Sequence, residues 1–313
     1  MTPSALTAGL AFVHRHGRLL ERRMSDLFFT SPGAVSAAAA VDALLAYRND
    51  DGGLGQALEP DLRAPTSHPL AVDFGLETAQ RITEADAGTD HNVRRRLRGL
   101  ADDCATWLST VLTDEAGLPI VLPDAAAYAR AAHWGDCRFD AGLNPTAGIV
   151  VRLRRFGVDA PWLAAAERFC VDRIEAMPAD EMGGHTLANI LAFLVSAPDR
   201  SWAMRQRDRL TADWDAVKSF HLYPGDGYGL TPLDLAPAPD DRLRARFPQK
   251  AVGDHLTVLA ADQQSDGGWG ITWEAPGEEA TQEWRAVRTV EAMRVLRLNG
   301  HPDYVDRPSS AVV

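Results

Sequence analysis

The chain has 313 residues, of which 46% are hydrophobic and 24% are charged. These proportions are ordinary for a globular protein and exclude a wholly disordered or fibrous chain. Acidic residues (43) outnumber lysine plus arginine (32), which gives a net charge of −11; this sign argues against a nucleic-acid-binding protein, because such proteins normally present a basic surface.

Helical patterns recur along the whole chain, and no stretch shows the alternation of a half-buried β-strand. Within residues 91–112, for example, the apolar residues recur on one stripe while the arginines fall toward solvent. The predicted helices in chain order are residues 34–47, 66–82, 91–112, 146–156, 160–177, 185–196, 199–217, 251–263 and 278–299. Gly300 follows the last of them and favours its termination. The sequence therefore predicts an all-α protein.

The cysteines and the N-terminus bear on the compartment. Cys104, Cys137 and Cys170 are odd in number and lack Cys-x-x-Cys spacing, which is typical of a protein in a reducing environment. The apolar stretch at residues 8–13 is short and is followed at once by charged residues, unlike an export signal. No stretch reaches the ~18 consecutive apolar residues of a membrane span. We therefore expect a cytoplasmic protein without a membrane span.

Two glycine-rich connections repeat each other. Asp51-Gly-Gly-Leu-Gly55 follows the predicted helix 34–47, and Asp266-Gly-Gly-Trp-Gly270 follows the predicted helix 251–263. Aspartate can accept from backbone N–H groups in such a turn, and paired glycines permit positive φ. A recurring unit of helix, turn and helix buries its apolar face against its neighbours.

These residues carry a family resemblance. Gln263-Gln-Ser-Asp-Gly-Gly-Trp-Gly270 resembles the repeat of squalene–hopene cyclases, related terpene cyclases and protein prenyltransferase β subunits. The chain also resembles a group of bacterial proteins of about this length, through Ala-Leu-Glu-Pro-Asp61, Leu-Asn-Pro-Thr-Ala147, Tyr-Gly-Leu-Thr-Pro-Leu-Asp234 and Ile-Thr-Trp-Glu274. The resemblance implies one (α/α) toroid over residues 1–306, with inner helices around a cavity and outer helices surrounding them. We expect a loose tail at residues 307–313.

The chain departs from that superfamily in its chemical motifs. It lacks the Asp-x-Asp-Asp acid motif of protonation-initiated cyclases and the Asp-Asp-x-x-Asp metal motif of ionisation-initiated cyclases. The zinc ligands of prenyltransferases have no residue-by-residue match, and the spacing of His133 and Cys137 alone is weak evidence for zinc. We therefore expect no metal or cofactor of the protein's own, with Mg²⁺ entering only if the substrate is a diphosphate.

Acidic residues follow both repeated turns. Glu59 and Asp61 follow the first, and Glu274, in register with Glu59, follows the second. Equivalent positions in a ring of repeated units lie at the same end, so we expect these carboxylates to gather at one rim of the cavity. Paired carboxylates in an apolar pocket split their pKa values, which leaves one as an acid. Asp234, in a long loop with little helical pattern, is the fourth catalytic candidate.

Tryptophans and further polar residues accompany these acids, and aromatic faces stabilise cations or stack on sugar rings. The residues expected to bind substrate are Arg63, Trp134, Asp140, Tyr228, Trp273, Glu283, Trp284 and Arg285. Structural roles are the alternative for each: an acid can cap a helix, and Arg63 can form a salt bridge with Asp61.

The leading hypothesis is a terpene-cyclase-like enzyme that processes isoprenoids. A carboxylic acid would protonate a small hydrophobic substrate, and aromatic side chains would shield the carbocation from water. A glycan-active toroid, hydrolase or lyase, that uses two carboxylates is a second hypothesis. A non-catalytic scaffold that binds a small molecule is a third. The sequence does not give the oligomeric state.

Overall fold

The computed structural model describes residues 4–85 and 90–305. These residues form twelve α-helices, together with short 3-10 and π segments and isolated β-bridges but no β-strand. The predicted all-α class is therefore confirmed. The expected tail at residues 307–313 lies outside the described residues.

The helices fall in the order that the sequence patterns predict, with three additions. They are α1 (Ala5–His16), α2 (Leu19–Ser25), α3 (Ala34–Leu45), α4 (Pro69–Ala85), α5 (His91–Leu108), α6 (Leu143–Arg155), α7 (Leu163–Ala176), α8 (Gly184–Ser196), α9 (Arg200–Leu210), α10 (Pro232–Leu235), α11 (Gln249–Ala261) and α12 (Glu278–Leu298). Each predicted helix corresponds to one of these, whereas α1, α2 and α10 were not predicted. Helix α9 ends at Leu210 instead of continuing to 217. The side chain of Asp213 accepts from the backbone N–H of Asp215 at 3.0 Å, which offers this segment an alternative to helical hydrogen bonds.

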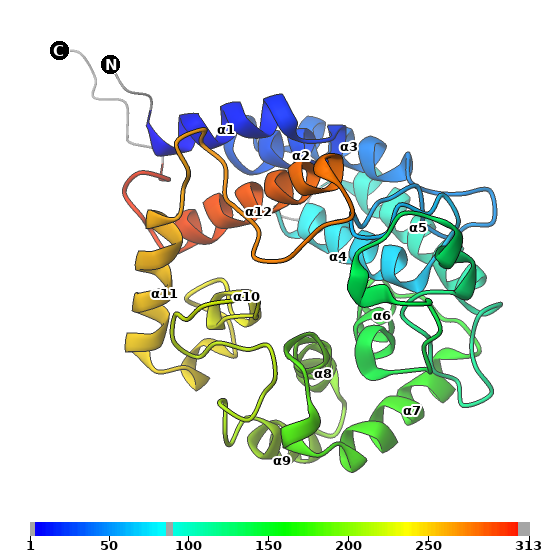
Figure 1. Cartoon of the computed structure of the whole chain (residues 1–313). Helices are drawn as coiled ribbons and strands as arrows, with labels where there is room; N and C mark the ends of the chain where they lie inside the picture. The colour runs from blue at the N-terminus through cyan, green and yellow to red at the C-terminus, as the bar shows by residue number, and fades with distance from the viewer. Residues whose placement is uncertain (1–3, 86–89, 306–313) are drawn as a thin grey trace.

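Successive helices follow one another around a circle (Figure 1). Neighbouring pairs in contact are α2 with α3, α3 with α4, α4 with α6, α6 with α8, α10 with α11, α11 with α12, and α12 with α1. The last contact joins the two ends of the described chain. There Gly9 lies so close to Met293 that a Cβ atom on Gly9 would be 2.5 Å from the methionine sulfur.

Both repeated turns have the predicted chemistry. Oδ1 of Asp51 accepts from the N–H of Gly53 at 2.9 Å, and Oδ1 of Asp266 accepts from the N–H of Gly268 at 3.0 Å. The first glycine of each turn has positive φ, +90° in the first copy and +94° in the second. The two copies are therefore the same turn in structure as well as in sequence.

The two turns also pack against equivalent neighbours. A Cβ atom on Gly52 would lie 3.1 Å from the carbonyl oxygen of Asp103 in α5, and one on Gly267 would lie 2.3 Å from that of Ala8 in α1. Helix α5 follows the first repeat in the chain, whereas α1 lies at the opposite end of the chain from the second repeat. Helix α1 thus packs on the turn before α12 in the same way that α5 packs on the turn before α4.

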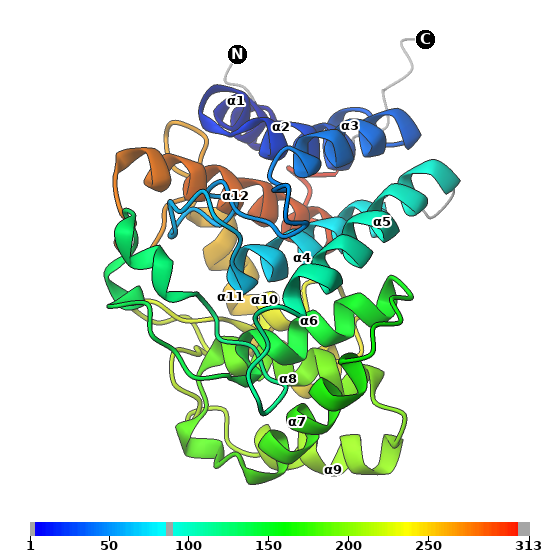
Figure 2. The same ribbon diagram turned by 90° about the vertical axis from the view of Figure 1, so that its right-hand side faces the viewer.

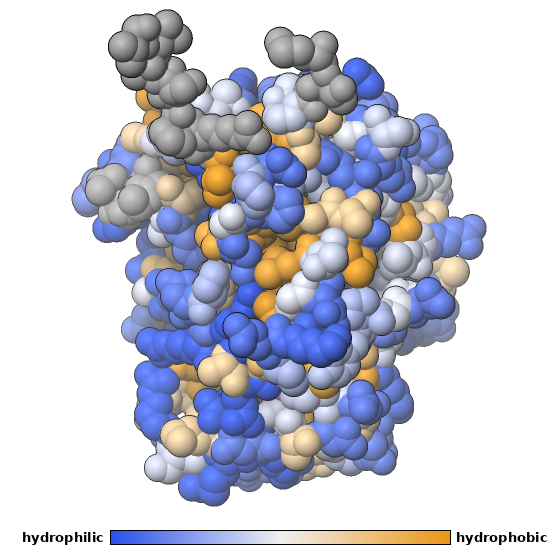
Figure 3. All heavy atoms as spheres, turned by 90° about the vertical axis from the view of Figure 1, so that its left-hand side faces the viewer, coloured by the Kyte–Doolittle hydropathy of each residue, from blue (hydrophilic) through white to orange (hydrophobic). Residues whose placement is uncertain are grey.

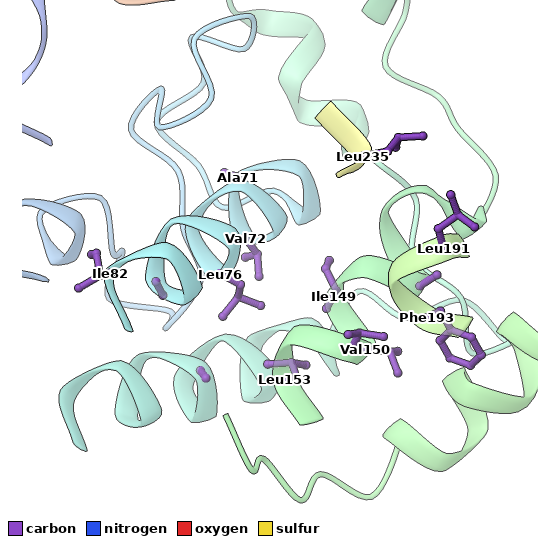
Figure 4. Packing of buried hydrophobic residues seen from close by; sticks show 14 of the residues in the cluster. Ala71, Val72, Leu76, Ile82, Ile149, Val150, Leu153, Leu191, Phe193 and Leu235 are labelled. Atoms are coloured by element: carbon purple, nitrogen blue, oxygen red, sulfur yellow. The ribbon is translucent and has the colours of Figure 1, made fainter. Parts of the chain in front are cut away.

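The core lies between the helices of this circle. Figure 4 shows α4, α6 and α8 packed through aliphatic and aromatic side chains. Those labelled include Val72, Leu76, Ile149, Val150, Leu153, Leu191 and Phe193. None of the described helices is both long enough and apolar enough to cross a bilayer. On the side where α11 lies, hydrophilic residues cover most of the surface around a hydrophobic patch (Figure 3).

Long loops gather on one side of the molecule. The loops that precede α4, α6 and α12 all lie at the left of Figure 2, although they are far apart in the chain. A backbone bridge between Leu62 and Arg130 joins the first two. This gathering brings Asp61, in the loop before α4, next to Trp273, in the loop before α12.

Candidate functional site

Asp61 is held by two tryptophans from the opposite end of the chain. Its carboxyl group is buried, and Oδ1 accepts from Nε1 of Trp284 at 2.8 Å and from Nε1 of Trp273 at 3.3 Å. The backbone of the loop is also fixed, because Asp61 O accepts from Ala131 N at 2.8 Å. Indole N–H groups can only donate, so both indoles present the same polar edge to this one oxygen.

The second oxygen of Asp61 differs from the first. Oδ2 makes no hydrogen bond to a described residue, and it is not among the enclosed polar atoms that lack a partner. Burial raises the pKa of Asp61, while the hydrogen bonds from Trp284 and Trp273 and the charge of His133 lower it; the net shift is upward. Asp61 is thus a buried carboxyl group with an elevated pKa; two indoles hold one of its oxygens, and the other makes no hydrogen bond to a described residue.

Glu59 lies beside Asp61 but is enclosed. Its Oε2 is buried and has no hydrogen-bond partner in the described part of the chain. Burial raises the pKa of Glu59 well above its ordinary value, and the neighbouring charge of Asp61 adds to the rise; backbone amides and Arg18 oppose it. Glu59 therefore favours its protonated form, which avoids two negative charges side by side.

Two arginines brace the loop without neutralising Asp61. Nη1 of Arg18 donates to the carbonyl oxygens of Ala57 and Leu58, at 2.9 Å each, and Nη2 contacts Glu21 at 2.7 Å. Arg63 forms an ion pair with Glu283 of α12.

The predicted alternative of a salt bridge between Arg63 and Asp61 is therefore wrong, because the guanidinium group pairs with Glu283 instead. Arg63 and Glu283 do lie at the site, but their charges form an ion pair with each other. Their assignment to substrate binding stays a prediction.

Four aromatic side chains form a continuous series beside Asp61, which we call the aromatic row: Phe74, Trp284, Trp273 and Tyr228. Neighbouring ring centroids are 6.0, 5.2 and 5.4 Å apart, and every neighbouring pair meets edge to face. No ring of the row is fully buried. At the end of the row, the hydroxyl of Tyr228 forms a hydrogen bond with Nε2 of His185.

The other candidate acids are placed differently. Oδ2 of Asp234 accepts from the N–H and the hydroxyl of Thr231, at 2.8 Å each, which completes a capping box at α10. Oδ1 lies 3.5 Å from Arg288. Glu274 and Asp140 are exposed at the surface. Glu274 was expected to gather with Glu59 and Asp61 at one rim of the cavity; its side chain is exposed, and Trp273 is the residue of this loop that bonds to Asp61.

Arg285 and Trp134 also lie away from the aromatic row. Arg285 contacts Asp266 at 2.8 Å and Gln264 at 2.6 Å, and its guanidinium carbon lies 4.5 Å from the ring centroid of Phe12. It therefore braces the second turn, and its assignment to substrate binding stays a prediction. Trp134 is buried in a separate small apolar cluster, and its Nε1 has no acceptor among the described residues.

The surface near the site is hollowed on its outer side. A hollow of about 520 Å³ is lined by residues 128–132, Gly135 and Pro276. One of these residues, Ala131, donates its backbone N–H to the carbonyl oxygen of Asp61. A second hollow, of about 600 Å³, lies elsewhere between residues 114–116 and α7. No three His, Cys, Asp or Glu side chains of residues 4–85 and 90–305 are grouped so as to hold a metal ion. An association of Mg²⁺ with a diphosphate substrate stays a prediction.

The sequence analysis missed three residues of this site. Phe74 fits the apolar stripe of its helix, so its pattern indicates core packing. His185 lies in the first turn of a helix and carries no recognisable motif, and Arg18 lies in a charged segment with several other arginines. Only the three-dimensional contacts distinguish these residues from their neighbours.

Comparisons with models of known protein families, with curated protein sequences and with solved structures give no match for this chain.

Proposed function

We propose that this protein is an enzyme that uses Asp61 to protonate an alkene or epoxide of an isoprenoid-like substrate, and that its helices form an (α/α) toroid around the reaction site. The observation that carries the proposal is the carboxyl group of Asp61. It forms no ion pair with a described residue, two indoles of the aromatic row fix one of its oxygens, and the other oxygen has no hydrogen-bond partner among those residues.

Three features support the toroid. Neighbouring helices contact one another around the circle of Figure 1, and α12 contacts α1. The two repeated turns share one geometry. Helix α1 packs on the second turn as α5 packs on the first. We assign α1, α3, α5, α7, α9 and α11 to the outer layer and the even-numbered helices to the inner layer.

The chemistry follows from the two oxygens of Asp61. In the protonated acid, the proton on Oδ2 passes to a carbon of the substrate double bond, and the electron pair of that bond forms the new C–H bond. The indole hydrogen bonds to Oδ1 then stabilise the carboxylate that remains. The aromatic row borders the resulting carbocation, whose positive charge is attracted to aromatic faces.

The same placement favours this chemistry over glycoside hydrolysis. Hydrolysis requires two carboxyl groups that both reach the substrate from opposite sides of the bond. Glu59 precedes Asp61 on the same loop and its free oxygen is enclosed, while Asp234 caps α10. Asp61 is therefore the one candidate acid in the described aromatic site that presents an unbonded oxygen.

A non-catalytic scaffold would be expected to have all its interior acids neutralised. Several are: Asp73 contacts Arg152 at 2.5 Å, Glu291 pairs with Arg81, and Glu283 pairs with Arg63. Asp61 forms no such ion pair among the described residues, and its hydrogen bonds come from neutral indoles. An acid that is anchored but not neutralised is suited to proton transfer.

The experiment compares Asp61→Asn with Glu274→Gln, which removes an exposed acid of the equivalent loop. Purified proteins are incubated with squalene-type olefins and with prenyl diphosphates, with and without Mg²⁺, and products are analysed by gas chromatography and mass spectrometry. We expect product from the wild type and Glu274→Gln, and a fall of ~10²–10⁴-fold for Asp61→Asn. Full conversion by Asp61→Asn, or no conversion of any of these substrates by the wild type, would overturn the proposal.

A further inference from the structure

A reaction that begins by adding a proton to carbon ends most simply by removing one, and the residues described above leave that second group unassigned. His185 and Tyr228 form a hydrogen-bonded pair at the far end of the aromatic row from Phe74. Their ring planes are within 20° of parallel, with centroids 6.0 Å apart. Tyr228 contacts Trp273, which donates to Asp61, so the pair and the acid border the same wall.

The local structure holds both members of the pair. His185 lies in the first turn of α8, which begins at Gly184 without a side-chain cap. Tyr228 lies in a loop closed by backbone hydrogen bonds, from His221 N to Leu230 O at 2.8 Å and from Leu230 N to Ser219 O at 2.9 Å. Tyr228 is 40% exposed, so part of its side chain is open to a ligand in front of the row.

Burial is the main reason that His185 favours a neutral imidazole. Burial lowers its pKa, and the more distant His133 acts in the same direction; Asp234 and Glu77 oppose the shift but do not cancel it. The N-terminus of α8 is a further influence that disfavours a positive charge. At neutral pH the ring therefore has an unprotonated nitrogen that can accept a proton.

The charges around Tyr228 keep the phenol protonated. Burial raises its pKa to about 12, and the carboxylates of Asp234, Asp61 and Glu59 add to the rise, while Arg288 opposes it. A protonated phenol beside a neutral imidazole can pass a proton on without either group starting as an ion.

We propose that Tyr228 removes the proton that ends the reaction, with His185 as its relay partner. This inference rests on the proposed function. The C–H bond next to the cationic carbon breaks and its electron pair forms the C=C bond of the product. The proton passes to Oη of Tyr228 while the phenol's own proton passes to Nε2 of His185. The imidazolium returns its proton to solvent, and the carboxylate of Asp61 takes one up from solvent.

The test is the ratio of alkene to alcohol among the products, because a cation that meets no base is captured by water. We expect Tyr228→Phe to lower this ratio about tenfold or more, while substrate consumption changes less than about threefold. His185→Gln should lower it in the same direction and should also abolish its pH dependence. In the wild type, the ratio should fall as the pH drops low enough to protonate His185. Tyr223→Phe, in the same loop but beside Lys250, is the matched control and should leave the ratio unchanged.

The outcomes separate this inference from the proposed function. An unchanged ratio in both variants, with circular dichroism showing that they are folded, overturns the role of the pair and leaves Asp61 unaffected. An altered ratio together with full conversion by Asp61→Asn overturns the role of Asp61 and retains that of Tyr228. Absence of any conversion by the wild type overturns both.

Discussion

Nε1 of Trp284 donates a 2.8 Å hydrogen bond to Oδ1 of Asp61, which joins the second turn of α12 to the loop before α4. This contact joins an N-terminal and a C-terminal part of the chain at the site. It also lowers the pKa of Asp61 against the larger rise that burial causes, since a hydrogen bond to a carboxylate stabilises the charged form.

Trp284→Phe should therefore raise the pKa of Asp61. The substitution keeps an aromatic ring against Phe74 but removes the donor, so the ionised carboxyl loses its shorter hydrogen bond. Carbon-13 NMR of the aspartate carboxyl groups measures the titration. Trp202→Phe is the control, because its indole donates to Glu175 at the surface, and it should leave the pKa of Asp61 unchanged. A pKa that stays constant or falls in Trp284→Phe contradicts this account.

Glu59→Gln should stabilise the protein increasingly as the pH rises. The folded-state pKa of Glu59 is raised well above 4.5, so the folded state binds more protons than the unfolded state above that pH. Wild-type stability is thus lost as the pH rises through the folded pKa, by up to about 1.4 kcal/mol per pH unit from this group. Glutamine cannot ionise, so the free energy of unfolding of the variant does not fall with pH through this group. Urea unfolding across a pH series measures the difference, and a difference that is constant with pH would rule out the raised pKa.

Gly267→Ala should destabilise the fold by more than about 1 kcal/mol. The φ of Gly267 is +94°, and a Cβ atom there would meet the carbonyl oxygen of Ala8 at 2.3 Å, which would push α1 away from the second turn. Gly99→Ala is the matched control, because it lies within α5 with no atom near the added Cβ. It should stabilise the protein by ~0.5–1 kcal/mol through its helix propensity. Equal melting temperatures for the two variants would contradict the packing of α1 on this turn.

Arg152→Met should destabilise the fold by about 3–5 kcal/mol at neutral pH. Arg152 contacts Asp73 at 2.5 Å and Glu77 at 3.2 Å, so its removal leaves two acids of α4 without this partner. The loss should shrink at low pH, because protonation removes the uncompensated charge. Denaturant unfolding at neutral and acidic pH measures both effects. A small loss that does not depend on pH would show that these acids do not need Arg152.

The sequence predicts most of the fold because the signals for helices and turns are local. Apolar periodicity places nine helices, and the Asp-Gly-Gly pattern gives the geometry of both turns before any contact is known. Helix α10 has four residues, too few to show a period, and was not predicted. Helix α9 ends at Leu210, shortly before Asp213, whose side chain accepts a backbone hydrogen bond of the kind that competes with helical ones.

The candidate site is predictable only in part. Glu59 and Asp61 are neighbours on one loop, so their proximity follows from the sequence. Which groups surround them does not, because Arg63 can satisfy its charge with either Asp61 or Glu283 and only the packing of α12 decides between the two. The same reasoning applies to Arg285, whose nearest acid in space is Asp266 of the second turn.

The most direct test of the role of Asp61 is the isotope content of the product formed in D₂O. The proton on the carboxyl group of Asp61 exchanges with solvent, so each turnover should place one solvent deuterium on a carbon of the product. Mass spectrometry should show product heavier by a single deuterium for the wild type, and no product above background for Asp61→Asn. Product that carries no deuterium, formed in D₂O by the wild type, would contradict protonation by Asp61.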